Sequence, residues 1–172
     1  QTSKHGSRAF GDANGQPMFT HVANAEAQTA WHNACEGQKE KFRHDIAPRA
    51  IFTYPPIASV GLTETEAALS HDIYVGKADY HSTAMGIALR ENRGFSKVII
   101  DRKSMSLLGF HIFGPHAPIL IQEVVNAMAH GGQIGWLLSG MHIHPSLSEL
   151  TIKTFSNLVV SLATDSRQKQ SY

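Results

Sequence analysis

The chain has little cysteine: Cys35 is the single thiol in 172 residues. One thiol excludes an internal disulfide framework and any Cys-x-x-Cys redox centre within these residues. Because it has no partner thiol, we interpret Cys35 as a small, half-buried residue on a helix. This low cysteine content favours a cytoplasmic location.

Long apolar runs and a charge bias are also missing. Apolar runs such as residues 119–125 fall well short of the roughly 18 residues that a membrane-spanning helix needs. Fifteen basic and fourteen acidic residues, spread along the chain, give no reason to expect a nucleic-acid partner or an anionic membrane surface. The chain begins with Gln1 and has no secretory-signal pattern, so we expect a truncated or processed chain.

The apolar fraction of 42% is enough for a folded core, and the first 45 residues predict a short strand, a turn and a helix. Arg8–Phe10 predicts a short strand that runs into a turn at residues 11–15. Apolar residues at helical spacing predict a helix over His21–Ala34, which Gly37 ends. A polar connection follows, and we place a domain boundary near residue 46.

The remaining residues predict strands in the middle and helices toward the end. Strands are expected at residues 50–54 and 58–62. A helix is expected to begin with the capping box of Thr63 and Glu66 and to run through Leu69. A hairpin is expected to join residues 95–100 to 105–113 around a turn at 101–104. Helices are expected at 119–130 and 134–138, the first of them stopped by Gly131 and Gly132. This order predicts an α+β domain, an antiparallel β-sheet flanked by α-helices.

A last helix is expected to begin with a second capping box, formed by Ser146 and Glu149. Its predicted apolar face consists of Leu147, Leu150, Ile152, Phe155, Leu158 and Val159. The polar tail from Asp165 is expected to fray.

The eleven histidines make a metal site the first hypothesis to test. His142 and His144 form a His-x-His pair, but no third ligand stands at a spacing typical of zinc sites, so we expect no bound metal. His111 and His116 are interpreted as surface or hydrogen-bonded histidines. The glycines at 131, 132 and 135 do not form a dinucleotide-binding fingerprint, because they lack its order and lie between two predicted helices.

The segment His144–Glu149 carries the strongest chemical signal. A histidine before a proline precedes a helix whose first turn supplies a carboxylate, and an imidazole held by a carboxylate can exchange protons near neutral pH. The alternative is that Glu149 caps the helix while His144 packs against a turn. The spacing alone favours this alternative.

Several ordered segments resemble the C-terminal third of the pyridine nucleotide-disulfide oxidoreductases, the family of dihydrolipoamide dehydrogenase, glutathione reductase and mercuric reductase. The segments are Pro48–Glu64, Gly94–Asp101, Leu107–Pro115, Ile121–Glu123 and His142–Glu149. The last is similar to the family's active-site signature, and the additional His142 favours the dihydrolipoamide dehydrogenase branch. The resemblance implies that residues 46–172 form the dimerisation domain of a homodimer.

Upstream segments resemble the end of the family's FAD-binding domain, so residues 1–45 are expected to be its C-terminal remnant. Ala9–Asp12 resembles its last strand, in which an aspartate binds the ribitol chain, and Phe19–Ala23 resembles the start of the helix whose N–H groups face the flavin. By this resemblance the cofactor-binding residues are Gly11, Asp12, His21, Val22 and Pro145.

The resemblance implies a reaction that passes two electrons between NAD(P) and a small dithiol or disulfide substrate, through FAD and a cysteine pair absent from this chain. His144 would be the acid/base, acting on the partner subunit's active site, and Glu149 would orient it. We expect this chain by itself to be inactive and to bind no flavin. The alternative is a free-standing, non-catalytic dimerisation or interaction module.

Overall fold

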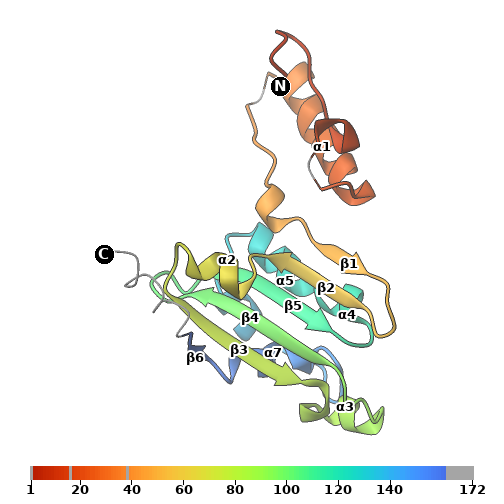
Figure 1. Cartoon of the computed structure of the whole chain (residues 1–172), viewed down its shortest axis with the longest axis vertical. Coiled ribbons are helices and arrows are strands. Elements are labelled where there is room, and N and C mark those ends of the chain that lie inside the picture. Colours follow the sequence, from red (N-terminus) through yellow and green to blue (C-terminus); the bar gives the residue numbers. More distant parts are fainter. Residues whose placement is uncertain (1, 16, 38, 162–172) are drawn as a thin grey trace, which may run out of the picture. The chain divides into compact units, whose positions relative to one another are not determined.

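The computed structural model describes residues 2–15, 17–37 and 39–161. The chain divides between Ala47 and Pro48 into two compact units (Figure 1). In the described residues, no helix is long and apolar enough to cross a membrane.

The first unit is built around helix α1, Thr20–Cys35, which confirms the helix expected over 21–34. Short 3-10 helices at Gly11–Asn14 and His44–Ile46 lie on either side of it in the sequence. The strand expected at Arg8–Phe10 is not formed, because no strand in the described part of this unit offers its backbone a partner. Cys35 is exposed, so its interpretation as half-buried is wrong: it is the last residue of α1, where the chain leaves the helix.

The second unit contains one six-stranded antiparallel sheet with the order β1-β2-β5-β4-β3-β6 (Figure 1). The strands are β1 Arg49–Ile51, β2 Ile57–Gly61, β3 Ile73–Asp79, β4 Phe95–Asp101, β5 Leu107–Phe113 and β6 Val159–Val160. The helices are α2 Glu64–Ala68, α3 Ala84–Ala88, α4 Ala117–Leu120, α5 Gln122–Ala129, α6 Gly135–Leu138 and α7 Glu149–Phe155, with a 3-10 turn at Tyr80–Ser82. This architecture confirms the predicted α+β class.

The core lies on both faces of the central strands. Val98, Ile99 and Ile100 of β4 are all fully buried, because α7 packs on β3 and β4 while α2 packs with Ile99 in a second apolar cluster. A strand covered on both faces has no polar face, so β4 has a continuous apolar run. Because α7 packs on this sheet, the position of its first residue, where the preceding loop ends, is fixed.

Local signals correctly predicted the hairpin and the first capping box. Thr63 and Glu66 exchange the expected reciprocal bonds at the start of α2, and β4 pairs with β5 as expected. The helix expected over 119–130 is present as α4 and α5, which meet at Ile121, and the short helix expected over 134–138 is present as α6.

The end of the chain differs from the prediction. Helix α7 stops at Phe155, and Val159 belongs to β6, which pairs with Tyr74 and Val75 at the edge of β3. The prediction of a longer helix is wrong, because the backbone of Val159 and Val160 pairs with the edge of β3. Strand β3 itself was not predicted from the sequence. The tail expected to fray from residue 165 lies outside the described residues.

Asp101 holds the hairpin turn between β4 and β5 together. Its Oδ1 accepts bonds from the backbone N–H groups of Lys103 and Ser104, and its Oδ2 lies 2.7 Å from Nδ1 of His71. The Ser104 backbone bond, followed by the His71 bond, lowers the pKa of Asp101 to about 2. The turn is therefore stabilised by an ionised carboxylate.

We expect Asp101→Ala to lower the free energy of unfolding by about 2 kcal/mol at pH 7, as the lowered pKa implies. A lowered carboxyl pKa stabilises the fold above the ordinary pKa of 3.8, and this stabilisation is lost as the pH falls through about 2. Urea unfolding between pH 7 and pH 2.5 measures the difference, which should shrink across the acidic part of this range. Asp79→Ala, which removes an exposed pair with Lys77, is the control; an equal loss there would refute the role of Asp101.

Candidate functional site

The candidate site lies on the loop between α6 and α7. Residues 141–143 of this loop are irregular, residues 144–148 form bends and a turn, and the His144–Pro145 peptide bond is cis. Helix α7 follows directly and places Glu149 in its first turn. The loop therefore presents His144 one turn before a packed helix that carries the carboxylate.

His144 and Glu149 are brought together. Nδ1 of His144 lies 2.8 Å from Oε1 of Glu149, and the two side chains are 70% and 18% exposed. The hydrogen bond with His144, followed by the backbone N–H of Ser146, holds the pKa of Glu149 below its ordinary value. An ionised carboxylate that accepts from Nδ1–H leaves Nε2 as the nitrogen that can exchange a proton.

The expected capping box at Ser146 is only half formed. Oε2 of Glu149 accepts a bond from the Ser146 backbone N–H at 3.0 Å, but the Ser146 hydroxyl bonds the N–H and the hydroxyl of Ser148. The two interpretations of Glu149, helix cap and partner of His144, are therefore compatible, because each uses a different carboxylate oxygen.

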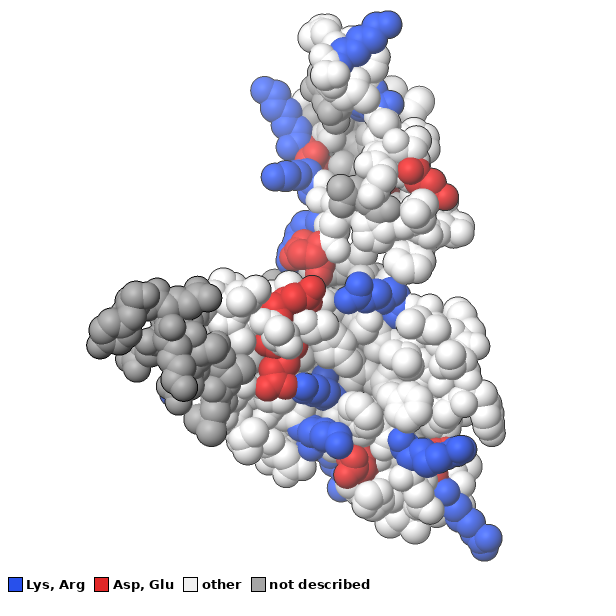
Figure 2. Space-filling model, viewed as in Figure 1, with Lys and Arg blue, Asp and Glu red and all other residues white. Residues whose placement is uncertain are grey.

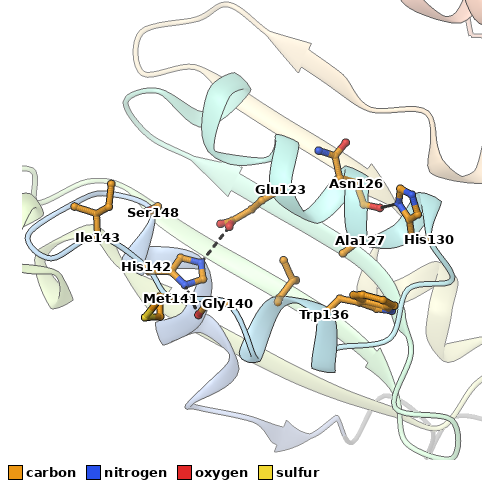
Figure 3. A pocket seen from close by; sticks show the side chains of 11 residues that line it. Glu123, Asn126, Ala127, His130, Trp136, Gly140, Met141, His142, Ile143 and Ser148 are labelled. Carbon is orange, nitrogen blue, oxygen red and sulfur yellow. Dashed lines mark hydrogen bonds and ion pairs between the residues drawn. The ribbon is translucent and has the colours of Figure 1, made fainter.

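His142 faces a different partner, which sequence reasoning missed. Its Nε2 lies 3.1 Å from Oε2 of Glu123 in the first turn of α5, and its Nδ1 lies 3.2 Å from the carbonyl oxygen of Gly140 (Figure 3). The two residues help to line a cavity of about 610 Å³, which Trp136 and Met141 also line. A lone glutamate on an amphipathic helix gives no signal of such a contact in the sequence.

The interpretation of His111 and His116 as surface or hydrogen-bonded histidines is confirmed for both. His111 lies 3.1 Å from the carbonyl oxygen of Leu62, and burial lowers the pKa of its imidazole. His116 is exposed at the start of α4 with φ +61°. Within the described residues, no three His, Cys, Asp or Glu side chains are grouped so as to hold a metal ion.

The residues expected to contact flavin fall in both units. Gly11 and Asp12 begin the first 3-10 helix, and His21 and Val22 lie in the first turn of α1, whereas Pro145 lies in the second unit. Val22 is only 2% exposed, so its side chain belongs to the core of its unit. The Gly11 N–H donates to Oε2 of Glu26 at 2.6 Å and is therefore already paired.

Glu26 is the centre of the first unit and was also missed by sequence reasoning. Its carboxylate accepts bonds from Gly11 and Asn14, and it lies 2.5 Å from Nε2 of His44. Burial opposes ionisation, but the bonds with His44, Gly11 and Asn14 together hold the pKa of Glu26 below its ordinary value. This pattern ties two segments of the unit, the 3-10 helices at Gly11–Asn14 and His44–Ile46, to α1.

The start of α1 has the geometry that an anionic group needs. Its N-cap, Phe19, provides no side-chain cap, and α1 is 16 residues long. The N–H groups of an uncapped first turn point out of the helix and favour a negatively charged partner. The residues of this unit thus fit a flavin through backbone groups of α1, while Gly11 shapes the adjoining turn.

Comparison with known proteins identifies the family. Residues 47–154 match the model for the pyridine nucleotide-disulphide oxidoreductase dimerisation domain. The chain is 40% identical over 157 residues to a mycothione reductase of Mycobacterium tuberculosis, covering 87% of this chain and 34% of that protein. It is 37% identical over 142 residues to dihydrolipoyl dehydrogenase 2 of Haloarcula marismortui, covering 82% of this chain and 30% of the relative.

Solved structures show the same fold. LpdA of Mycobacterium tuberculosis aligns with a TM-score of 0.79 at 23% identity, over 85% of this chain and 32% of that one. The Cu(II) complex of RclA, an HOCl-induced flavoprotein disulfide reductase of Escherichia coli, aligns with a TM-score of 0.78 at 26% identity, over 91% of this chain and 36% of that one. The chain spans about a third of the length of these relatives. It belongs to the pyridine nucleotide-disulphide oxidoreductase family and carries that family's dimerisation domain.

Proposed function

We propose that this chain is the C-terminal part of an FAD- and NAD(P)-dependent oxidoreductase acting on a small dithiol or disulfide, located in the cytoplasm. Residues 46–172 form the interface of a homodimer, and residues 1–45 belong to the FAD-binding domain. The observation that carries the proposal is the His144–Glu149 pair: an exposed imidazole oriented through Nδ1 by an ionised carboxylate, in a member of this family.

The pair would serve as the acid/base of thiol–disulfide exchange. As a substrate thiol attacks the enzyme's cysteine disulfide, Nε2 of His144 takes the S–H proton, one S–S bond forms and another breaks, and a cysteine leaves as a thiolate. Glu149 stabilises the resulting imidazolium through the Nδ1–H bond. In the reverse direction the same nitrogen returns the proton to the departing thiol.

The cofactor would be held through α1 and its neighbouring turn, with Gly11, Asp12, His21, Val22 and Pro145 as contact residues. FAD supplies two-electron transfer between the nicotinamide and the cysteine pair. The start of α1 would face it with backbone N–H groups, because Phe19 leaves the helix without a side-chain cap. The cysteine pair lies outside this chain.

Apolar side chains near His144 support the dimer. Trp136, Met141 and Ile143 are 65%, 101% and 76% exposed, and all three line the same cavity. Apolar groups exposed together on α6 and on the loop that follows it favour burial against another protein surface. A second subunit that covers this loop would bring His144 to its own cysteine pair, so His144 would act across the interface.

Mixed dimers of the full-length enzyme test this arrangement. One subunit carries His144→Gln, and the other carries a serine in place of the first cysteine of the redox pair. Each homodimer should be nearly inactive, whereas the mixed dimer keeps one complete site and should regain about half of the wild-type turnover, as expected for independent sites. Mixed dimers carrying both changes in one subunit and neither in the other should lose both sites. The opposite pattern would show that His144 acts within its own subunit.

A further inference from the structure

His142 and His144 lie two residues apart but differ sharply in environment. The His142 side chain is 14% exposed, whereas the His144 side chain is 70% exposed. His142 bonds Glu123 on α5, and His144 bonds Glu149 on α7. The short segment between them is therefore held at both ends by helices that are distant from each other in the sequence.

The backbone of this segment provides no comparable support. Within the described chain, residues 141–145 neither donate nor accept a backbone–backbone hydrogen bond. Their position must come from side-chain contacts, and the bond to Glu123 is the one that joins His142 to α5. Figure 3 shows the His142 ring between Glu123 and Gly140 at the wall of the cavity.

The hydrogen-bond chemistry of His142 makes this contact specific. A carbonyl oxygen can only accept, so Nδ1, bonded to Gly140, must carry a proton. Nε2 must then either donate to an ionised Glu123 or accept from a protonated one. In both states one proton lies between the two side chains, and an apolar replacement at either position leaves the other without its partner. Oε1 of Glu123 is already buried with no hydrogen-bond partner among the described residues, so loss of His142 would leave neither oxygen with a partner in that part of the chain.

We propose that Glu123 and His142 form a positioning pair, which holds the loop against α5 and thereby sets the place of His144. This inference rests on the proposed function of His144 and assigns a role to two residues that touch no reacting atom. His142 thus acts through His144, two residues later in the chain. If the loop moves, His144 moves with it, and a displacement of about 1 Å at an acid/base can cost up to about a hundredfold in rate.

The test is a double-mutant cycle in the full-length enzyme. His142→Ala should lower kcat by about 10- to 100-fold while leaving flavin bound, and His142→Gln, whose amide can still donate to Glu123, should recover most of it. In a His144→Gln background, His142→Ala should lower kcat by no more than about twofold, because residues acting as one unit are not additive. His130→Ala is the control, since His130 lines the same cavity but its ring, among the described residues, bonds the carbonyl oxygen of Asn126 one turn earlier and no other helix.

Each outcome decides between the possibilities. If His142→Ala leaves kcat unchanged while His144→Gln lowers it, the positioning role is wrong and the proposed function stands. If His142→Ala lowers kcat equally in the wild-type and His144→Gln backgrounds, the effect is a general structural one and the inference is wrong. The same holds if His142→Gln does not recover kcat. If His144→Gln itself has no effect, the proposed function fails and this inference fails with it.

Discussion

Replacing His144 with glutamine in the full-length enzyme should lower kcat by about 10²- to 10⁴-fold, the range that a general acid/base contributes. Glutamine can keep a hydrogen bond but cannot exchange a proton near neutral pH. His144 is 70% exposed and bonds Glu149 in the first turn of the helix that follows its loop, so its replacement removes little packing. The fold, the dimer and the bound flavin should therefore be retained.

Steady-state kinetics, the flavin absorbance spectrum and light scattering measure these properties on the same sample. His81→Gln is the matched control, because His81 is an exposed histidine in the second unit. It should leave kcat within about twofold, as expected for a surface position. A His144→Gln enzyme with wild-type turnover would refute the acid/base role, and loss of flavin or dimer would mean that the residue acts on assembly.

Glu149→Gln should have the second largest effect, lowering kcat on the order of a hundredfold. The amide can still accept the bond from the Ser146 N–H just before α7, but it lacks the negative charge that stabilises the protonated His144. Because the pKa of Glu149 is held below its ordinary value of 4.5, its charge is present above that value and is lost only as the pH falls through the lowered pKa. The loss in the variant should therefore persist throughout the neutral range.

Glu66 provides a matched control for the capping role. Glu66 follows Thr63 by three residues, as Glu149 follows Ser146, and its Oε2 accepts a bond from the Thr63 N–H at 2.8 Å. This backbone bond is the main cause that holds the pKa of Glu66 below its ordinary value. Glu66→Gln should leave kcat within about twofold, since a cap affects helix stability and not the reaction. Kinetics and circular dichroism on both variants separate the two roles. Equal kinetic effects would show that Glu149 acts as a cap alone.

The elements with local signals were predicted from the sequence, and those with distant partners were not. The turn at 101–104 and the Thr63–Glu66 box depend on residues at most a few positions apart, so their pattern is visible in the chain. Strand β3 was missed because polar Lys77 and small Gly76 interrupt its apolar residues. Gly76 is nonetheless required there, because a Cβ would lie 2.2 Å from the Thr154 carbonyl oxygen of α7.

The same distinction holds at the candidate site. The pairing of His144 with Glu149 spans five residues and could be considered from spacing, although spacing could not exclude a helix cap. The structure shows that Glu149 makes both contacts, one with each oxygen. Glu123 and Glu26 could not be identified in advance, because their partners lie 19 and up to 18 residues away in the chain.

The sequence by itself determined the family resemblance, the α+β class and the residues of the His144–Glu149 segment, because these depend on residue order and short-range spacing. The tertiary structure decided that α7 ends before Val159 and Val160, which pair with β3 instead. It also decided that α5 lies where Glu123 can bond His142. Such contacts join side chains whose distance is set by the packing of the sheet and its helices. No local pattern in the chain encodes that distance.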